Sequence, residues 1–143
     1  MAELFHVGLT VKNLERSLTF YRDVVGMQPG ERFEVKSKEF DTLTNNPGAR
    51  LQVCYLTAGS FMLQLIEYVA GGGTTLGLHH NNVGSPHMSF YVADVAAKYR
   101  EVQQRGDVKI TSGLVQILPT MRSFYTEDPD GVPVEFLQLA KKS

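Results

Sequence analysis

The stretch Phe5–Leu14, FHVGLTVKNL, decides the fold because the chain repeats its pattern at Pro86–Val95, PHMSFYVADV. In both copies apolar and polar residues alternate, as they do in a half-buried strand. When the copies are aligned, His6 falls on His87. Because successive side chains of a strand lie on opposite faces, each histidine shares no face with the apolar residues of its own strand. The repeat therefore predicts two equivalent strands, each offering one histidine as a metal ligand.

The first copy opens a module with a clear order of elements. Helical spacing of apolar residues follows from Leu14 to Val25, and Gly26 supplies a stop. We expect a strand, a long loop and a two-stranded hairpin after it, over Met27–Val35, Lys36–Arg50, Leu51–Leu56 and Phe61–Tyr68. The first half thus reads β-α-β-β-β.

The second copy opens a module with the same order. We predict a strand over Pro86–Val92 and a helix from Asp94 to Gly106. Two shorter segments follow over Val108–Thr111 and Leu114–Leu118, and a closing hairpin pairs Arg122–Thr126 with Val132–Leu139. We therefore expect an α+β fold with an internal duplication. Residues 1–143 form a single domain in this prediction, with module one at 1–69, a linker at 70–85 and module two at 86–143.

Composition excludes several classes of protein. The chain has 143 residues, 43% of them apolar and 20% charged, which is ordinary for a globular protein. A net charge of −1 without a basic run argues against nucleic-acid binding. No apolar stretch reaches the ~20 residues of a membrane span, and no signal peptide is recognisable. The single Cys54, in the apolar run LQVCYL, fits a buried inert thiol and a cytoplasmic location.

The strands that close the two modules supply the remaining candidate ligands. LQLIE in the first module (63–67) aligns with VEFLQ in the second (134–138), so that Gln64 falls on Glu135. Glu67 is chemically a better ligand than Gln64, but its odd separation from Gln64 places it on the opposite face of the strand. We prefer Gln64 because it shares the phase of Glu135.

His6, Gln64, His87 and Glu135 form a coherent donor set. Imidazole, amide and carboxylate groups suit a divalent cation such as zinc, nickel, cobalt, iron or manganese. An ionised Glu135 inside an apolar strand would cost several kcal/mol without a partner. A bound cation removes that cost, as exposure at a sheet edge also would.

Three stretches carry a resemblance to a known family: FHVGLTVKNLERSLTFYRDVVGM, PHMSFYVADV and FYTEDPDGVPVEFLQ. Together they resemble the vicinal oxygen chelate superfamily, which includes glyoxalase I, methylmalonyl-CoA epimerase, extradiol dioxygenases, and fosfomycin and bleomycin resistance proteins. The resemblance implies two βαβββ modules that form a curled mixed sheet around a central metal, often in a homodimer. It places the family's metal ligands on His6, Gln64, His87 and Glu135.

The resemblance also implies a class of reaction. In the favoured interpretation a divalent metal holds a small metabolite, and Glu135 acts as the base that removes a proton α to a carbonyl, as in a lyase, isomerase or epimerase. A glutamine at the ligand position of Gln64 resembles the methylmalonyl-CoA epimerase branch, whereas the stretch DPDGVPVE resembles the glyoxalase and dioxygenase branches. An extradiol-type dioxygenase and a non-catalytic drug- or metabolite-sequestering protein are the alternatives.

The substrate pocket is predicted from position alone. Its expected lining residues are Met62, Ile66, Tyr91, Tyr125 and Arg122. Arg50, His79 and His80 are further candidates for contact with an anionic substrate, but for these and for Arg122 a surface role is the favoured interpretation, because only their position in loops or at strand ends points to a substrate. The expected partners are a small-molecule substrate and a second copy of the chain, because the edges of a curved sheet need pairing or cover.

Overall fold

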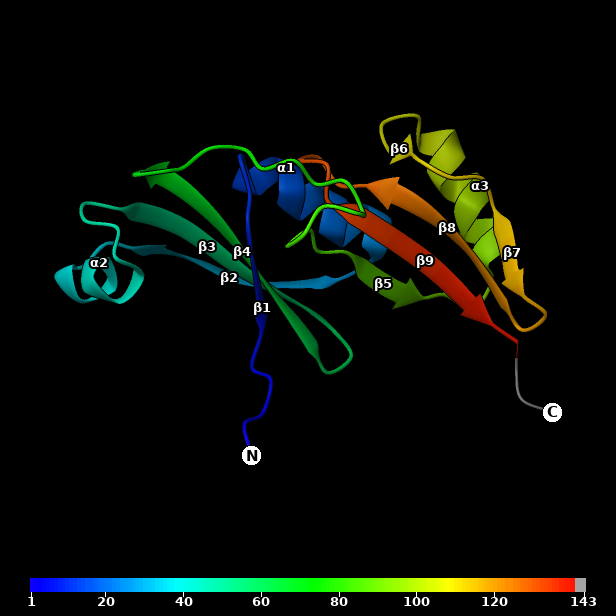
Figure 1. Cartoon of the computed structure of the whole chain (residues 1–143), viewed down its shortest axis with the longest axis horizontal. Coiled ribbons are helices and arrows are strands. Elements are labelled where there is room, and N and C mark those ends of the chain that lie inside the picture. Colours follow the sequence, from blue (N-terminus) through cyan, green and yellow to red (C-terminus); the bar gives the residue numbers. More distant parts are fainter. Residues whose placement is uncertain (141–143) are drawn as a thin grey trace. The chain divides into compact units, whose positions relative to one another are not determined.

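The computed structural model describes residues 1–140 and divides into two compact units, Met1–Thr75 and Leu76–Ser143. Each unit contains one mixed sheet and a helix packed against it (Figure 1). The predicted α+β class is confirmed. No helix within residues 1–140 is long and apolar enough to span a membrane.

The first unit contains four strands in the order β1-β4-β3-β2. Their bounds are β1 (Val7–Thr10), β2 (Gln28–Val35), β3 (Arg50–Ala58) and β4 (Phe61–Ala70). Strand β1 runs parallel to β4, and the remaining neighbours are antiparallel. This arrangement puts the first strand of the chain directly beside the strand that closes the module.

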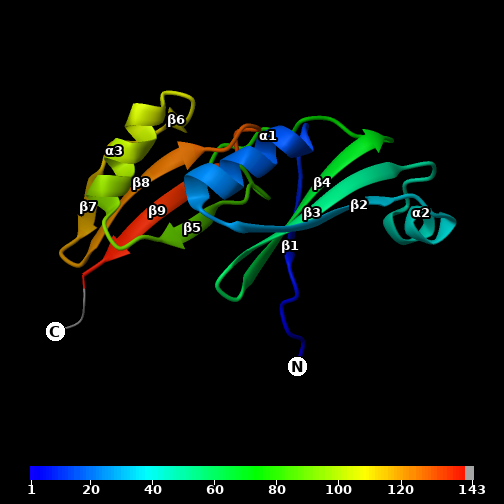
Figure 2. The same ribbon diagram turned by 180° about the vertical axis from the view of Figure 1, so that it is seen from behind.

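The helix of the first unit begins and ends as the sequence predicts. The side chain of Asn13 accepts a hydrogen bond of 2.9 Å from the backbone N–H of Arg16, which caps α1 (Leu14–Thr19). The helix continues as the π-helical segment η1 (Phe20–Val25) and ends at Gly26, whose φ of 91° requires the left-handed conformation. Helix α1 packs against β3 and β4 (Figure 2), and Leu14 and Leu18 are among its buried residues.

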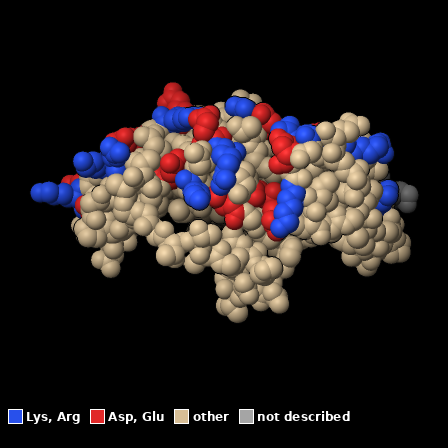
Figure 3. Space-filling view, turned by 90° about the horizontal axis from the view of Figure 1, so that it is seen from above, with Lys and Arg blue, Asp and Glu red and all other residues tan. Residues whose placement is uncertain are grey.

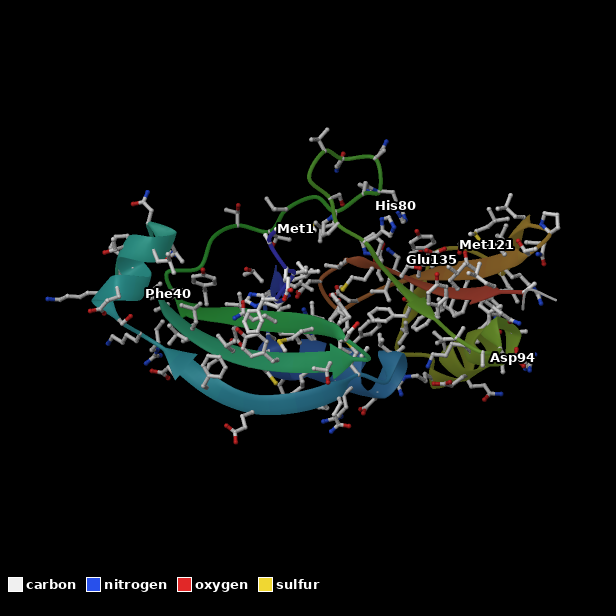
Figure 4. The ribbon with its side chains drawn as sticks, turned by 90° about the horizontal axis from the view of Figure 1, so that it is seen from below. Met1, Phe40, His80, Asp94, Met121 and Glu135 are labelled. Atoms are coloured by element: carbon white, nitrogen blue, oxygen red, sulfur yellow. The ribbon has the colours of Figure 1, made fainter. Side chains whose placement is uncertain are left out.

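A second helix, α2 (Lys38–Thr44), lies where the sequence predicted a loop over Lys36–Arg50. Ser37 caps it by accepting a 3.1 Å hydrogen bond from the N–H of Phe40. The side chain of Phe40, which Figure 4 labels, packs against a buried cluster that contains Leu51 and Val53. The loop prediction was wrong for this segment because a single apolar anchor, without a helical repeat of apolar residues, holds the helix on the sheet.

The second unit repeats the plan. Its elements are β5 (Met88–Tyr91), α3 (Val95–Arg105), β6 (Lys109–Ile110), β7 (Val115–Leu118), β8 (Met121–Glu127) and β9 (Pro133–Leu139). The main strand order is β5-β9-β8-β6, β5 is parallel to β9, and β7 pairs with β8. Asp94 caps α3 through a 2.9 Å hydrogen bond from the N–H of Ala97. Helix α3 packs against β8 and β9 (Figure 2).

Candidate metal and substrate site

His6 and Gln64 share one face of the sheet in the first unit. Gly8 is the register partner of Gln64, and His6 lies two residues before Gly8 on the same side of the chain. A Cβ atom on Gly8 would lie 3.4 Å from Oε1 of Gln64. The glycine therefore leaves open the space beside the amide oxygen, which is the atom that would bind a cation.

Tyr55 holds the amide of Gln64 in place. Nε2 of Gln64 donates a 2.8 Å hydrogen bond to the hydroxyl oxygen of Tyr55. Since the amide nitrogen is engaged there, Oε1 is the group presented beside Gly8. The amide is thus oriented as a metal ligand would need to be.

His6 has a buried nitrogen that the rest of the fold leaves unsatisfied. Its ring packs edge-on against Phe5 and Tyr55, with centroids 5.0 Å and 5.4 Å away. Among the described residues, Nδ1 of His6 is buried and finds no hydrogen-bond partner. Buried polar atoms are nearly always satisfied, so this orphaned nitrogen fits a ligand for an external group such as a cation.

His87 and Glu135 share one face of the sheet in the second unit, as His6 and Gln64 do in the first. Ser89 is the register partner of Glu135, and His87 lies two residues before Ser89. The hydroxyl of Tyr125 contacts Oε2 of Glu135 at 3.4 Å. Burial, and then the negative charge and hydrogen bond of Glu135, raise the pKa of Tyr125 above its usual value. The phenol therefore stays protonated beside the carboxylate.

His80 also reaches this part of the second unit, from the segment before β5. Its ring lies edge-on to Tyr125 at 4.7 Å and 6.4 Å from the ring of His87. Figure 4 labels His80 and Glu135 in this unit. His79 and His80 are both exposed, and the carbonyl of His79 accepts a hydrogen bond from the N–H of Asn82. Of the two neighbouring histidines, only His80 has a ring contact with the candidate site residues of this unit among the interactions described.

Glu67 faces the helix. Its Oε2 accepts a 2.7 Å hydrogen bond from the backbone N–H of Leu14, at the start of α1. Gln64 lies on the opposite face of β4, together with His6. The choice of face made from the sequence agrees with this arrangement.

The expected pocket residues are distributed unevenly. Met62 and Ile66 are half-buried and share the face of Gln64. Tyr91 shares the face of His87 but is 76% exposed. Arg122 pairs with Gln138, which lies on the helix side, so the structure does not bring Arg122 to the face of Glu135. Arg50 pairs with Ala70 at the end of β4.

Sequence reasoning missed the aromatic residues of the first unit. Tyr55 stacks on Phe33 with ring centroids 5.9 Å apart, and Phe5 lies 6.2 Å from Tyr55. A signal for Tyr55 existed, because it pairs with Gln64 as Tyr125 pairs with Glu135. The internal repeat, extended to the middle strand of each module, would have found it.

Each unit contains two of the four predicted ligands. Within residues 1–140 no three histidine, cysteine or carboxylate side chains gather into a metal-binding group. The first unit offers an imidazole and an amide, and the second an imidazole and a carboxylate. On the face visible in Figure 3, acidic and basic side chains are interspersed, as the near-zero net charge leads one to expect.

Known proteins resemble this chain over nearly its whole length. The model of the family described as the Glyoxalase/Bleomycin resistance protein/Dioxygenase superfamily matches residues 3–136. A lactoylglutathione lyase of Neisseria meningitidis serogroup A is 31% identical over 149 residues, covering 98% of this chain and 91% of that protein. The uncharacterized protein YwbC of Bacillus subtilis is 27% identical over 136 residues, covering 93% and 94%. A glyoxalase family protein from Bacillus cereus has the same fold, with a TM-score of 0.85 at 15% identity over 98% of this chain and 95% of that one.

Proposed function

This chain belongs to the glyoxalase/bleomycin resistance protein/dioxygenase superfamily, and from that premise we propose that it is a divalent-metal-dependent enzyme. Its reaction is the removal of a proton α to a carbonyl group of a small metabolite, as in a lyase, isomerase or epimerase. The observation that carries the proposal is the duplicated donor pair, His6 with Gln64 and His87 with Glu135, at equivalent register positions.

The residues present fit a divalent cation. Two imidazoles, one amide oxygen and one carboxylate suit zinc, nickel, cobalt, manganese or iron. The buried, unpartnered Nδ1 of His6 and the open space beside Oε1 of Gln64 support this assignment. When bound, such a cation supplies Lewis-acid polarisation of the substrate carbonyl.

Glu135 is the proposed base. Its carboxylate takes the proton from the substrate carbon, and the electron pair of the broken C–H bond moves toward the carbonyl. In a lyase or isomerase, Glu135 then returns the proton to the neighbouring carbon. In an epimerase, a second acidic group would have to deliver a proton to the opposite face of the same carbon, because return by Glu135 would restore the original configuration. The Tyr125 hydroxyl contacts Oε2 of this carboxylate.

Two features suggest the first substrates to test. The Neisseria relative is a lactoylglutathione lyase, so the adduct of glutathione with a 2-oxoaldehyde is the first choice. The exposed aromatic side chains of Phe5 and Phe33 lie beside Tyr55 and offer a surface to an apolar substituent.

We place the enzyme in the cytoplasm because its single cysteine, Cys54, is buried and free.

A second candidate is an extradiol-type dioxygenase. His6, His87 and Glu135 have the composition of the two-histidine, one-carboxylate set that holds iron in non-haem oxygenases. Oxygen uptake with catechols in the iron- or manganese-loaded protein is specific to this alternative. A sequestering protein would bind its ligand without turnover, with or without metal.

The test combines metal analysis with isotope exchange. The purified protein is loaded with zinc, nickel, cobalt or manganese, and incorporation of solvent deuterium into 2-oxoaldehyde–glutathione adducts, hydroxyketones and thioesters is followed. We expect stoichiometric metal and exchange in at least one substrate class, with exchange abolished in Glu135→Gln and metal lost in His6→Ala and His87→Ala. His79→Ala is the matched control. Substoichiometric metal under every loading condition, or no exchange across the panel, would overturn the proposal.

We also propose that the chain forms a homodimer. In each sheet the short first strand, β1 or β5, lies at an edge, and apolar side chains such as Val7 and Tyr91 on these strands are exposed. A second copy can cover such edges. Sedimentation at micromolar concentration is expected to give a dimer, and monomer alone would contradict this.

A further inference from the structure

Each module contains a tyrosine that touches both of its candidate metal ligands. Tyr55 is the register partner of Gln64, and Tyr125 is the register partner of Glu135. Each tyrosine reaches its partner through the hydroxyl group, at 2.8 Å and 3.4 Å. The same ring also lies edge-on to the histidine of its own module.

The two edge-on contacts have nearly the same geometry. The rings of His6 and Tyr55 are 5.4 Å apart at 70°, and those of His87 and Tyr125 are 6.0 Å apart at 69°. The sequence alignment of the two modules related only the candidate metal ligands to one another, and not the tyrosines. The structure shows that the contact of tyrosine with histidine and with the amide or carboxylate is duplicated as a unit.

We propose that Tyr55 and Tyr125 are positioning residues, which orient Gln64 and Glu135 for a divalent cation. The inference rests on the proposed function, because it needs the cation. Neither hydroxyl is assigned to the cation or to the substrate.

The argument for Tyr55 concerns the orientation of an amide. An amide has one end that can bind a cation and one end that cannot, so a freely rotating Gln64 would present the wrong end part of the time. The hydroxyl of Tyr55 accepts from Nε2 and so fixes the nitrogen end. Gly8 keeps the space beside the oxygen end open.

The argument for Tyr125 concerns a carboxylate. Glu135 offers only acceptors when ionised, so here the phenol must act as the donor. Its contact with Oε2 leaves Oε1 for a cation and limits rotation of the group. A phenol can act as donor or acceptor, so the same residue type serves glutamine in one module and glutamate in the other.

Packing holds both phenol rings in place before any ligand binds. Tyr55 is stacked on Phe33, and Tyr125 is held edge-on by His80 at 4.7 Å. A restrained ring places its hydroxyl at a fixed point, so less side-chain entropy is lost when the cation binds. Groups that orient metal ligands in this way usually contribute a factor of about 10–100 in metal affinity.

The test removes each hydroxyl separately in the full-length chain. Tyr55→Phe and Tyr125→Phe are compared with wild type for cobalt(II) affinity, by competition with a chelator, and for the visible absorption of bound cobalt(II). Tyr68→Phe and Tyr99→Phe are the matched controls. Tyr68 shares the face of Gln64 but packs against the cluster of Leu51 and Val53, whereas Tyr99 packs against Phe124.

The expected result is an affinity about 10–100 times weaker in Tyr55→Phe and Tyr125→Phe, with an altered cobalt spectrum, and wild-type values in both controls. Thermal unfolding without metal separates this role from a purely structural one, which would lower the melting temperature and leave the affinity of the folded protein unchanged. Wild-type affinity and spectrum in both test variants would overturn the inference while leaving the proposed function intact. Failure of the wild-type chain to bind cobalt(II) would overturn both.

Discussion

Glu67 and Gln138 hold equivalent positions on the closing strands of the two modules. The side chain of each accepts a hydrogen bond from the first residue of its module's helix. Oε2 of Glu67 accepts a 2.7 Å hydrogen bond from the N–H of Leu14, and Oε1 of Gln138 accepts a 2.9 Å hydrogen bond from the N–H of Val95. In both cases the donor is the first residue of the helix, where backbone N–H groups lack partners within the helix. The strand that closes each module thus fixes the start of the helix.

Glu67→Ala is expected to lower the free energy of unfolding by about 1–2 kcal/mol, since it leaves a partly buried N–H without its partner. Urea unfolding of the metal-free protein measures the change. Metal stoichiometry should stay at the wild-type value, because Glu67 lies on the helix side of β4. Loss of the metal in a variant that is still folded would show that Glu67, and not Gln64, is a ligand.

Gln64→Glu is expected to strengthen divalent metal binding by about tenfold or more, because it adds a negative charge beside the cation. The hydroxyl of Tyr55 would turn from acceptor to donor, as Tyr125 does toward Glu135. Chelator competition measures the affinity, and Gln64→Leu is the matched variant that should weaken it. Equal affinities in the three proteins would place residue 64 outside the metal site.

Cys54 is expected to resist alkylation in the native state. Burial is the main cause that raises the pKa of its thiol, so the thiol stays protonated in the folded chain at pH values where the unfolded chain would ionise. A raised native pKa gives a stabilising contribution that is complete below the unfolded pKa and is lost as the pH rises through the native pKa. Stability should therefore fall in the alkaline range.

Urea unfolding between pH 7 and 10 is the measurement for Cys54. Cys54→Ala is the control. Its free energy of unfolding should be lower because of the small cavity, but should fall less between pH 7 and 10 because no thiol ionises at this position. Rapid reaction of the native wild-type thiol with iodoacetamide at neutral pH would contradict the burial.

Glu135→Gln is expected to lower the pKa of Tyr125 toward its usual value. Burial is the largest cause of the raised pKa and remains in the variant, but the negative charge of Glu135 is removed. Titration of the metal-free protein, followed by NMR of tyrosine labelled at the ring carbon that bears the hydroxyl, measures the change. An unchanged Tyr125 titration would mean that the 3.4 Å contact does not persist in solution.

The sequence predicts the duplicated framework well because strand alternation and helix caps are local signals. Asn13 and Asp94 cap their helices as expected, and His6 and His87 hold matching positions beside the closing strands. The helix α2 escaped prediction because only Phe40 anchors it to the apolar cluster. Its cap, Ser37, could not be told apart from an ordinary loop serine.

The candidate site was harder to predict than the framework, since pocket residues depend on which face a strand presents. Arg122 was expected near the site, but its pairing with Gln138 places it on the helix side. Tyr55 was missed because a tyrosine in a strand carries no metal-ligand signal of its own. Only its pairing with Gln64 gives it a role.

Strand β4 carries Gln64 on one face and Glu67 on the other, and β9 carries Glu135 and Gln138 in the same way. A one-residue shift in the register of either strand would turn both members of its pair to the wrong face at once. The helix start and the candidate ligand are therefore inherited together, and insertions or deletions in this family member should be confined to the turns.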